Sequence, residues 1–230
     1  MGREKLDEVE VPWYYHITRI GLKTFLAVLT RCQFTGKENI PRQGRLLVVS
    51  NHLSLIDPPL VGFLMLSREM AFIAKKELFR YSILFSWLIR LFGAIPVHRG
   101  QTNREALRQA EKALADGLAL IVFPEGMRSR SFKLSAAYPG VALLACRSGA
   151  PILPIGISGT EQISGVTWLW RRPKIRVNIG QPFSLPQSNG DLNKVELTKL
   201  THYIMEHIAE LLPQQYQGEY ATRKLDAVRN

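Results

Sequence analysis

Residues 46–59 have the sequence LLVVSNHLSLIDPP and carry the clearest fold signals of the chain. The first part of this stretch, Leu46–Val49, has the length and the β-branched content of a buried strand. The two prolines at its end indicate the start of a helix, because proline fits the first helical turn and disfavours helical backbone in the residue before it. The polar residues between strand and helix are therefore expected at the carboxyl end of a strand. Ligands bind at that edge in open α/β sheets.

Within this stretch, His52 and Asp57 have side chains suited to acid–base chemistry. In one continuous helix their five-residue separation would turn them about 140° apart. A bend before Pro58 instead lets the Asp57 carboxylate accept a hydrogen bond from one ring nitrogen of His52, which leaves the other nitrogen as a base. The spacing also fits a structural role, with Asp57 capping the helix and His52 in a turn. Ser54 is interpreted as a turn former rather than a nucleophile.

The rest of the chain alternates between strand-like and helix-like segments. Strands are predicted at residues 70–74, 93–99, 118–123, 152–158 and 174–179, with a short edge strand and a turn within 33–41. Helices are predicted at 102–116, opened by a capping box at Thr102 and Glu105, and at 133–148 and 192–212. The last of these places apolar residues on one face, namely Val195, Leu197, Leu200, Tyr203, Ile204, Ile208 and Leu211. We therefore predict a single α/β domain with a mostly parallel or mixed central sheet flanked by helices on both faces.

Four ordered blocks of the sequence together resemble the glycerolipid acyltransferases. The first is Asn51-His52-x-x-x-x-Asp57, and the others are GAIPVHR at 93–99, FPEGMRS at 123–129 and APILPI at 150–155. Any one block alone is a weak signal, whereas four in the family's order are specific. One departure is Met127, where the family usually has threonine. Because methionine cannot donate a hydrogen bond to a phosphate, such a contact is left to backbone groups or to Ser129, and the acceptor headgroup stays open.

The resemblance implies a fold similar to the glycerol-3-phosphate acyltransferases and a specific reaction. A fatty acyl group would pass from acyl-CoA or acyl carrier protein to the sn-2 hydroxyl of 1-acylglycerol 3-phosphate (lysophosphatidate), giving phosphatidate. His52 would be the general base and Asp57 the residue that orients it. The thioester is a co-substrate, and no cofactor or metal is implied. The alternatives are acylation of another lysophospholipid or lyso-aminolipid, or a non-catalytic basic membrane-binding module.

Three basic residues, Lys75, Arg99 and Arg128, fall at or just after the predicted ends of three strands. If these ends converge near His52, the three cations can bind a phosphomonoester, with the arginines able to bind it bidentately. For Lys75 a solvated lysine is the alternative. Glu125 beside a phosphate is repulsive unless it orients Arg128 or receives a substrate hydroxyl. The full set of expected substrate-binding residues is Lys75, Arg99, Glu125, Gly126, Arg128 and Ser129.

The net charge of +11, from 30 Lys and Arg against 19 Asp and Glu, favours anionic partners. We expect an anionic membrane surface rather than nucleic acid, because the chain has no zinc-ligand spacing, RNA-binding strand signature or basic recognition helix. Residues 11–31 are aromatic at one end, carry basic residues and contain no run of 18 uncharged apolar residues, which favours an interfacial helix over a spanning one. An ordinary core-packing helix is the alternative. Residues 168–172 and an apolar helix at 77–91 are further candidate lipid contacts, with an exposed loop and a doubly buried helix as their alternatives.

The expected organisation has three parts: an amphipathic membrane-interface segment at 1–35, the acyltransferase domain at 36–212 and a polar tail at 213–230. Cys32 and Cys146 lie in apolar surroundings and are expected to be reduced. The charged start of the chain is not that of a signal peptide. These features predict a protein at the cytoplasmic face of a membrane, peripheral or monotopic.

Overall fold

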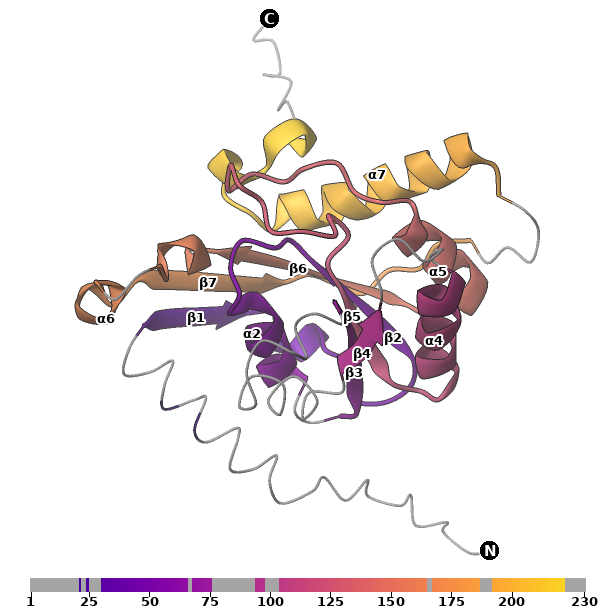
Figure 1. The fold of residues 1–230 in the computed structure, drawn as a ribbon, viewed down its shortest axis with the longest axis horizontal. Helices are drawn as coiled ribbons and strands as arrows, with labels where there is room; N and C mark the ends of the chain where they lie inside the picture. The colour runs from indigo at the N-terminus through magenta and orange to yellow at the C-terminus, as the bar shows by residue number, and fades with distance from the viewer. Residues whose placement is uncertain are drawn as a thin grey trace, which may run out of the picture.

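The computed structural model describes residues 21, 24, 30–65, 68–75, 94–97, 104–164, 167–186 and 192–221. Within them one sheet of seven strands has the order β1-β7-β6-β2-β5-β3-β4 (Figure 1). The strands are β1 (Arg31–Thr35), β2 (Leu46–Ser50), β3 (Met70–Lys75), β4 (Ala94–Val97), β5 (Ala119–Val122), β6 (Ile152–Ser158) and β7 (Lys174–Ile179). The pairing of β6 with β7 is antiparallel, and the other pairs are parallel. The predicted mostly parallel α/β sheet is confirmed.

Helices cover both faces of this sheet. The helices are α2 (Asp57–Leu64), α4 (Arg104–Ala115), α5 (Gly140–Ser148), α6 (Trp168–Arg171) and α7 (Lys194–Glu210), and single 3₁₀ turns lie at Lys37–Asn39, Thr160–Gln162, Gln214–Tyr216 and Gly218–Tyr220. In the central strand β2, Leu47 and Val49 pack into the cluster formed with α4, α5 and α7, whereas Leu46 and Val48 pack into the cluster that contains α2. All four are fully buried. A strand covered on both faces needs such a continuous apolar run.

The predicted helix at 133–148 is too long. The helix α5 begins at Gly140, and Pro139 is its N-cap. Proline disfavours helical backbone in the residue before it, so the chain ahead of Pro139 stays irregular. Backbone N–H groups of this segment form hydrogen bonds with other parts of the chain: the Leu134 N–H donates to the Tyr216 carbonyl, and the Ser135 N–H donates to the Glu125 carboxylate. This irregular segment reaches the candidate site.

The helix α7 is confirmed, but two residues assigned to its buried face are exposed. Val195 is 63% exposed and Tyr203 is 45% exposed. The residues that it buries are Thr201, Ile204, Met205, Ile208 and Ala209. Their spacing of three and four residues is the helical period, with a threonine inside the stripe that an apolar pattern alone does not count.

The boundaries predicted at residues 35 and 212 need correction. Residues 31–35 form β1, which pairs with β7 at the edge of the sheet. After α7 the chain makes two further turns that bury Tyr216 and Tyr220. The folded domain therefore includes residues 31–35 and 213–221. Most of the N-terminal segment, the predicted helix at 77–91, the cap at Thr102 and residues 222–230 lie outside the described residues.

Candidate active site

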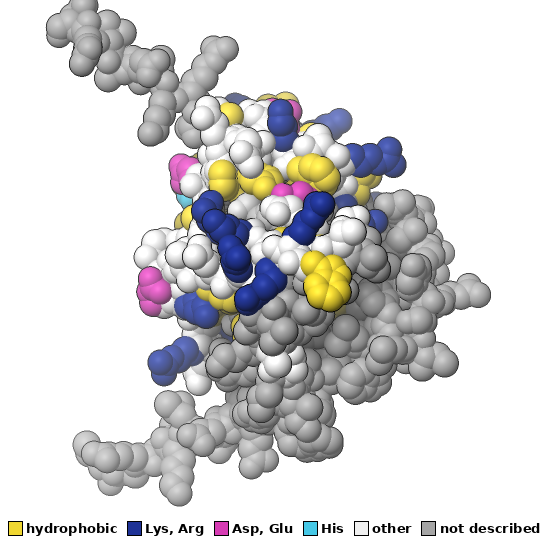
Figure 2. Space-filling model, turned by 90° about the vertical axis from the view of Figure 1, so that its left-hand side faces the viewer, with side chains coloured by type: hydrophobic (Ala, Val, Ile, Leu, Met, Phe, Trp, Pro, Cys, Tyr) yellow, Lys and Arg dark blue, Asp and Glu magenta, His cyan; other side chains and the backbone are white. Residues whose placement is uncertain are grey.

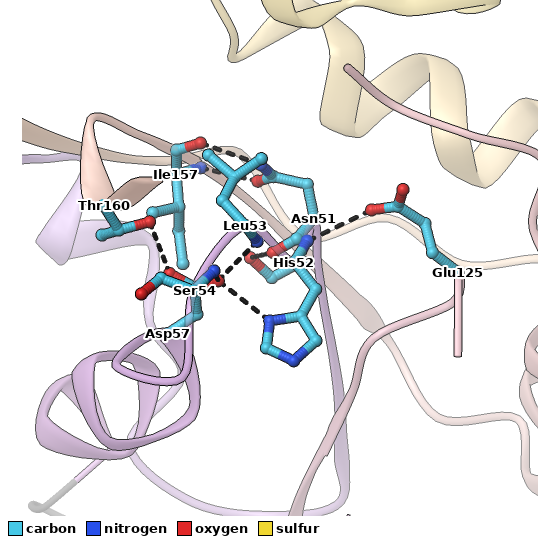
Figure 3. Close-up of polar contacts among 9 residues, drawn as sticks. Asn51, His52, Leu53, Ser54, Asp57, Glu125, Ile157 and Thr160 are labelled. Atoms are coloured by element: carbon cyan, nitrogen blue, oxygen red, sulfur yellow. Dashed lines mark hydrogen bonds and ion pairs between the residues drawn. The ribbon is translucent and has the colours of Figure 1, made fainter. Parts of the chain in front are cut away.

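The imidazole of His52 and the carboxylate of Asp57 are in direct contact, as the sequence predicted (Figure 3). His52 follows the end of β2, and Asp57 is the first residue of α2, where Ile56 rather than Asp57 is the N-cap. The His52 Nδ1 atom lies 2.9 Å from Asp57 Oδ2. Asp57 is fully buried, whereas the His52 side chain is 15% exposed. The carboxylate therefore lies inside the protein and the imidazole at its surface.

The Asp57 carboxylate is held by donors from three further groups. Its Oδ2 atom accepts hydrogen bonds from the backbone N–H groups of Leu53 and Ser54, each at 2.6 Å. Its Oδ1 atom accepts one from the Thr160 hydroxyl, also at 2.6 Å. With every neighbour donating, the ionised acceptor-only form of the carboxylate fits the site, and the Nδ1 atom of His52 carries its hydrogen toward it. The Nε2 atom, which points away from Asp57 in Figure 3, then presents a lone pair.

Asn51 fixes the start of this loop to the neighbouring strand β6. Its side-chain nitrogen donates to the Ile157 carbonyl, and its side-chain oxygen accepts from the Ile157 N–H, both at 2.8 Å. A carboxamide presents one donor and one acceptor side by side, which matches the backbone groups of one residue in an extended strand. Aspartate in its ionised form has no donor for the carbonyl. This explains why asparagine precedes the histidine.

Glu125, in the loop after β5, supports the backbone of His52. Its Oε1 atom accepts from the His52 N–H at 3.1 Å, and its Oε2 atom accepts from the N–H and the hydroxyl of Ser135 at 3.0 and 2.6 Å. Burial raises the pKa of Glu125 above its ordinary value, and these hydrogen bonds offset part of that rise. At 2% exposure Glu125 is almost fully buried, and its contacts are those of a support for the loop. A role of Glu125 in orienting Arg128 or receiving a substrate hydroxyl stays a prediction.

Ser129 holds the other side of the same backbone. Its N–H donates to the His52 carbonyl at 2.8 Å, so Glu125 and Ser129 together engage both backbone groups of His52. The Ser129 hydroxyl donates to the Lys133 carbonyl at 2.6 Å, and the residue is 8% exposed. Its hydroxyl proton is already used within the loop. The idea that this hydroxyl replaces the family's threonine toward a phosphate does not fit this conformation.

The remaining expected binding residues differ in how far the structure describes them. Gly126 has a φ of 68°, and a β-carbon there would lie 2.8 Å from the Tyr138 ring, so backbone conformation and space both favour glycine. Arg128 and Met127 are exposed in the same loop. Lys75 ends β3, and its side chain lies outside the described part of the chain, as does all of Arg99. The parallel strands β3, β4 and β5 do end at one edge of the sheet, which is where the sequence placed the three cations.

Three contacts at this site were not predicted from the sequence. Thr160 lies 103 residues from Asp57 and Ser135 lies 10 residues from Glu125, in a segment expected to be helical. The ring of Phe123 packs on the His52 imidazole with 4.5 Å between the centroids. Thr160 follows β6, so the common edge of the parallel strands was the one signal that could have suggested it.

The chain matches proteins of one family in both sequence and structure. The family model described as Acyltransferase matches residues 31–158, more than half of the chain. A chloroplastic 1-acyl-sn-glycerol-3-phosphate acyltransferase of Brassica napus is 25% identical over 76% of this chain and 52% of that protein. An enzyme of the same name from Bacillus subtilis is 26% identical over 86% of this chain and 96% of that protein.

A solved structure with the same arrangement is that of the 1-acyl-sn-glycerophosphate acyltransferase PlsC from Thermotoga maritima. It has a TM-score of 0.64 and 32% identity, and the match covers 84% of this chain and 75% of that one. The chain spans about half the length of the two plant relatives from Brassica napus and Arabidopsis thaliana. The matched region contains the strand–loop–helix unit of His52 and Asp57 and the loop that carries Glu125. The chain therefore belongs to the acyltransferase family.

Proposed function

We propose that this protein transfers a fatty acyl group from a thioester to the sn-2 hydroxyl of 1-acylglycerol 3-phosphate, giving phosphatidate. The observation that carries the proposal is the hydrogen bond between His52 and a fully buried Asp57. Family membership and the names of several relatives support the same reaction and acceptor. The donor is acyl-CoA or acyl carrier protein.

In the proposed reaction, Nε2 of His52 removes the proton from the sn-2 hydroxyl as its oxygen attacks the thioester carbonyl carbon. A carbon–oxygen bond forms, the carbon–sulfur bond breaks, and the imidazolium returns the proton to the departing thiolate. The ester and a free thiol are the products, so no cofactor is consumed. Asp57 stabilises the transient imidazolium and keeps Nδ1 protonated, as the acid does in other imidazole-based sites.

The carboxylate needs no movement to do this. Thr160 and the N–H groups of Leu53 and Ser54 fix its position, so the imidazole is oriented before substrate arrives. Glu125 and Ser129 fix the backbone of His52 in the same way. Orientation of this kind lowers the barrier because the entropy cost of positioning is met during folding.

Arg128 is proposed to bind the acceptor's phosphate, together with Lys75 and Arg99. Arg128 is exposed in the loop that also supports His52, so a phosphate bound by its guanidinium lies beside the site. In an Arg128→Ala variant the Michaelis constant for the acceptor should rise more than that for the donor. Equal changes for both substrates would argue against phosphate binding by Arg128.

The test of the reaction is conversion of labelled lysophosphatidate to phosphatidate by the purified protein, with each donor in turn. His52→Ala should lower kcat by about 10² to 10⁴, the usual contribution of general-base catalysis. His202→Ala is the matched control, because His202 is an exposed histidine on α7. Both variants should remain folded at the assay temperature, as circular dichroism would show. Near-native turnover by His52→Ala would refute the assignment of the base.

A second acceptor class is favoured by one observation, the exposed Met127 in the loop beside His52. Met127 is 51% exposed and offers no hydrogen-bond donor where the family usually has threonine. Turnover should therefore be compared for lysophospholipids with and without a terminal phosphomonoester. A preference for acceptors without one would replace lysophosphatidate with another lysophospholipid or a lyso-aminolipid and would leave the acyl transfer itself in place.

A further inference from the structure

One end of the sheet carries a cluster of exposed basic residues around a protruding tryptophan, which we call the α6 surface. Its members are Arg31, Trp170, Arg171, Arg172, Lys174 and Arg176, all of them exposed. They come from the edge strand β1, the short helix α6 with its C-cap, and the strand β7. Figure 2 shows this end of the molecule, with dark-blue Lys and Arg side chains gathered next to yellow apolar ones.

The basic residues of this surface lie close together in the chain and on paired strands. Residues 167–179 contain four basic residues and no acidic one. Arg31 pairs in register with Lys174, so two like charges lie on neighbouring parallel strands. Like charges in such positions repel and destabilise a sheet. A concentration of positive charge that costs stability points to an anionic partner.

Trp170 distinguishes between the possible anionic partners. It is 91% exposed, the highest exposure among the large apolar side chains of the described residues. Charge alone would suit an acidic protein as well as a bilayer, but a single projecting indole among arginines matches the composition of a membrane interface. There tryptophan lies at headgroup depth and basic residues contact lipid phosphates.

The α6 surface is also connected to the candidate active site. The backbone of Gly159 packs so closely on the Lys174 carbonyl that no side chain fits there, and the next residue, Thr160, donates to Asp57. The surface and the catalytic pair thus lie at the same end of the strands, where β2 and β6 finish and β7 begins. Four of the other exposed large apolar residues, Leu55, Met127, Phe132 and Tyr138, lie in the segments that follow β2 and β5 at this edge.

We propose that the α6 surface binds an anionic lipid bilayer and that this binding turns the His52 edge of the sheet toward the membrane. Trp170 inserts at headgroup depth, while Lys174, Arg176 and their basic neighbours contact the lipid phosphates. The contact belongs to the folded domain and is separate from the N-terminal segment. This inference goes beyond the proposed function, because it concerns binding to the membrane and not the identity of the acceptor or the donor.

Vesicle binding tests the proposal. The full chain is incubated with phosphatidylglycerol-containing and with purely phosphatidylcholine vesicles, and the bound fraction is measured by flotation. Lys174→Gln/Arg176→Gln should weaken binding to the anionic vesicles about 25-fold, since each basic residue near an anionic surface contributes about fivefold. The control is Lys194→Gln/Lys199→Gln, which removes two exposed charges from α7 and should change binding far less. Equal weakening by both pairs would mean that net charge alone acts, and it would overturn the assignment of this surface.

Insertion of Trp170 is measured by quenching of tryptophan fluorescence with lipids brominated near the headgroup. The native protein should be quenched more than Trp170→Phe, because only the native protein places an indole there. Equal quenching would overturn the insertion. If the variants lose binding to an acidic polypeptide such as polyglutamate while their vesicle binding is native, the surface binds protein and the proposal is wrong.

Acyl transfer to detergent-dispersed lysophosphatidate separates this inference from the proposed function. Lys174→Gln/Arg176→Gln and Trp170→Phe should turn over that dispersed acceptor at native rates, and they should be slower when the acceptor is presented in anionic vesicles. Should the protein show no acyl transfer at all, the flotation and quenching results still decide the membrane contact.

Discussion

At the scale of single residues, the site depends on hydroxyl and amide groups that hold a buried acid. Asp57 and Thr160 are both fully inaccessible to solvent, and the 2.6 Å hydrogen bond between them joins the start of α2 to the turn after β6. A buried carboxylate oxygen that loses its donor is costly, because water cannot replace it. Thr160 is therefore a positioning residue that acts through Asp57.

Replacement of Thr160 by valine should affect both stability and catalysis. Thr160→Val keeps the shape of the side chain but removes its hydroxyl, and we expect a loss of about 1–3 kcal/mol in the free energy of unfolding. The rate kcat should fall while the Michaelis constants stay near native values, because Thr160 touches no substrate. Thr160→Ser retains the hydroxyl and should restore most of the rate. If the serine variant is as slow as the valine variant, the hydroxyl is not what positions Asp57.

Glu125 should give the protein a specific dependence of stability on pH. Since burial raises its pKa in the folded state, the folded protein binds more protons than the unfolded chain from about pH 4 up to that raised pKa. This contribution is present at low pH and is lost as the pH rises through the window. Glu125→Gln lacks it, so the unfolding free energy of the variant minus that of the native protein should increase with pH. Urea titrations between pH 4 and 8 measure the difference, and a flat or falling difference would contradict the raised pKa.

At the scale of elements, the irregular segment before α5 shows how one loop serves the site. Phe132 has a φ of 60°, an uncommon backbone conformation for a bulky residue. Beyond it, Leu134 and Ser135 make the hydrogen bonds to Tyr216 and Glu125 that keep the segment in place. A helix from residue 133 would move the N–H and the hydroxyl of Ser135 away from Glu125 and leave Glu125 without two of its three donors. The break at Pro139 thus permits the support of His52.

The helix α7 begins with a capping box formed by Asn193 and Glu196. The Asn193 side chain accepts from the Glu196 N–H at 2.9 Å, and the Glu196 side chain accepts from the Asn193 N–H at 3.0 Å. Asn193→Ala should lower the unfolding free energy by about 1 kcal/mol, and Asn193→Ser should lower it much less. Urea denaturation followed by circular dichroism checks both values. Acyl transfer should be unchanged in both, because the cap is distant in the chain from His52 and Asp57, and a slower alanine variant would contradict this.

At the scale of the whole molecule, the two edges of the sheet have different roles. The carboxyl edge carries the His52 loop, whereas the amino edge is held together by the buried Arg68. Its guanidinium donates to the carbonyls of Pro41, Gly44 and Gly117, in the segments that lead into β2 and β5. Desolvation lowers the pKa of Arg68, but the group remains a cation with several donors in a fixed plane. One side chain therefore connects the starts of neighbouring strands.

Arg68→Met should destabilise the domain by about 2 kcal/mol or more, because the charged hydrogen bonds to the three carbonyls are lost. Arg68→Lys should recover little, since a single ammonium cannot reach all three carbonyls in the same plane. Folded protein of either variant should keep its native Michaelis constants, because this edge is opposite the site. The unfolding midpoint and the kinetics at a permissive temperature test this together. A native midpoint, or a large kinetic change without loss of stability, would show that the amino edge has another role.

Sequence patterns predicted the class of fold and the pairing of His52 with Asp57. The buried run Leu46–Val49 and the prolines after Asp57 are local signals, and local signals fix strand, bend and helix start. They also placed Lys75 and Arg128 at or just after the carboxyl ends of strands, and Gly126 in the loop that carries Arg128. The acyltransferase blocks added the identity of the family.

The groups that complete the site come from contacts between distant segments, which no local pattern predicts. Thr160 reaches Asp57 and Ser135 reaches Glu125 through pairings between segments that carry no period or motif of their own. Tertiary contacts also buried Glu125, used the hydroxyl of Ser129 within its loop and left Trp170 exposed. The physical reason is that hydrogen bonds and burial depend on distances in space, and a chain sets those distances only when its strands have packed side by side.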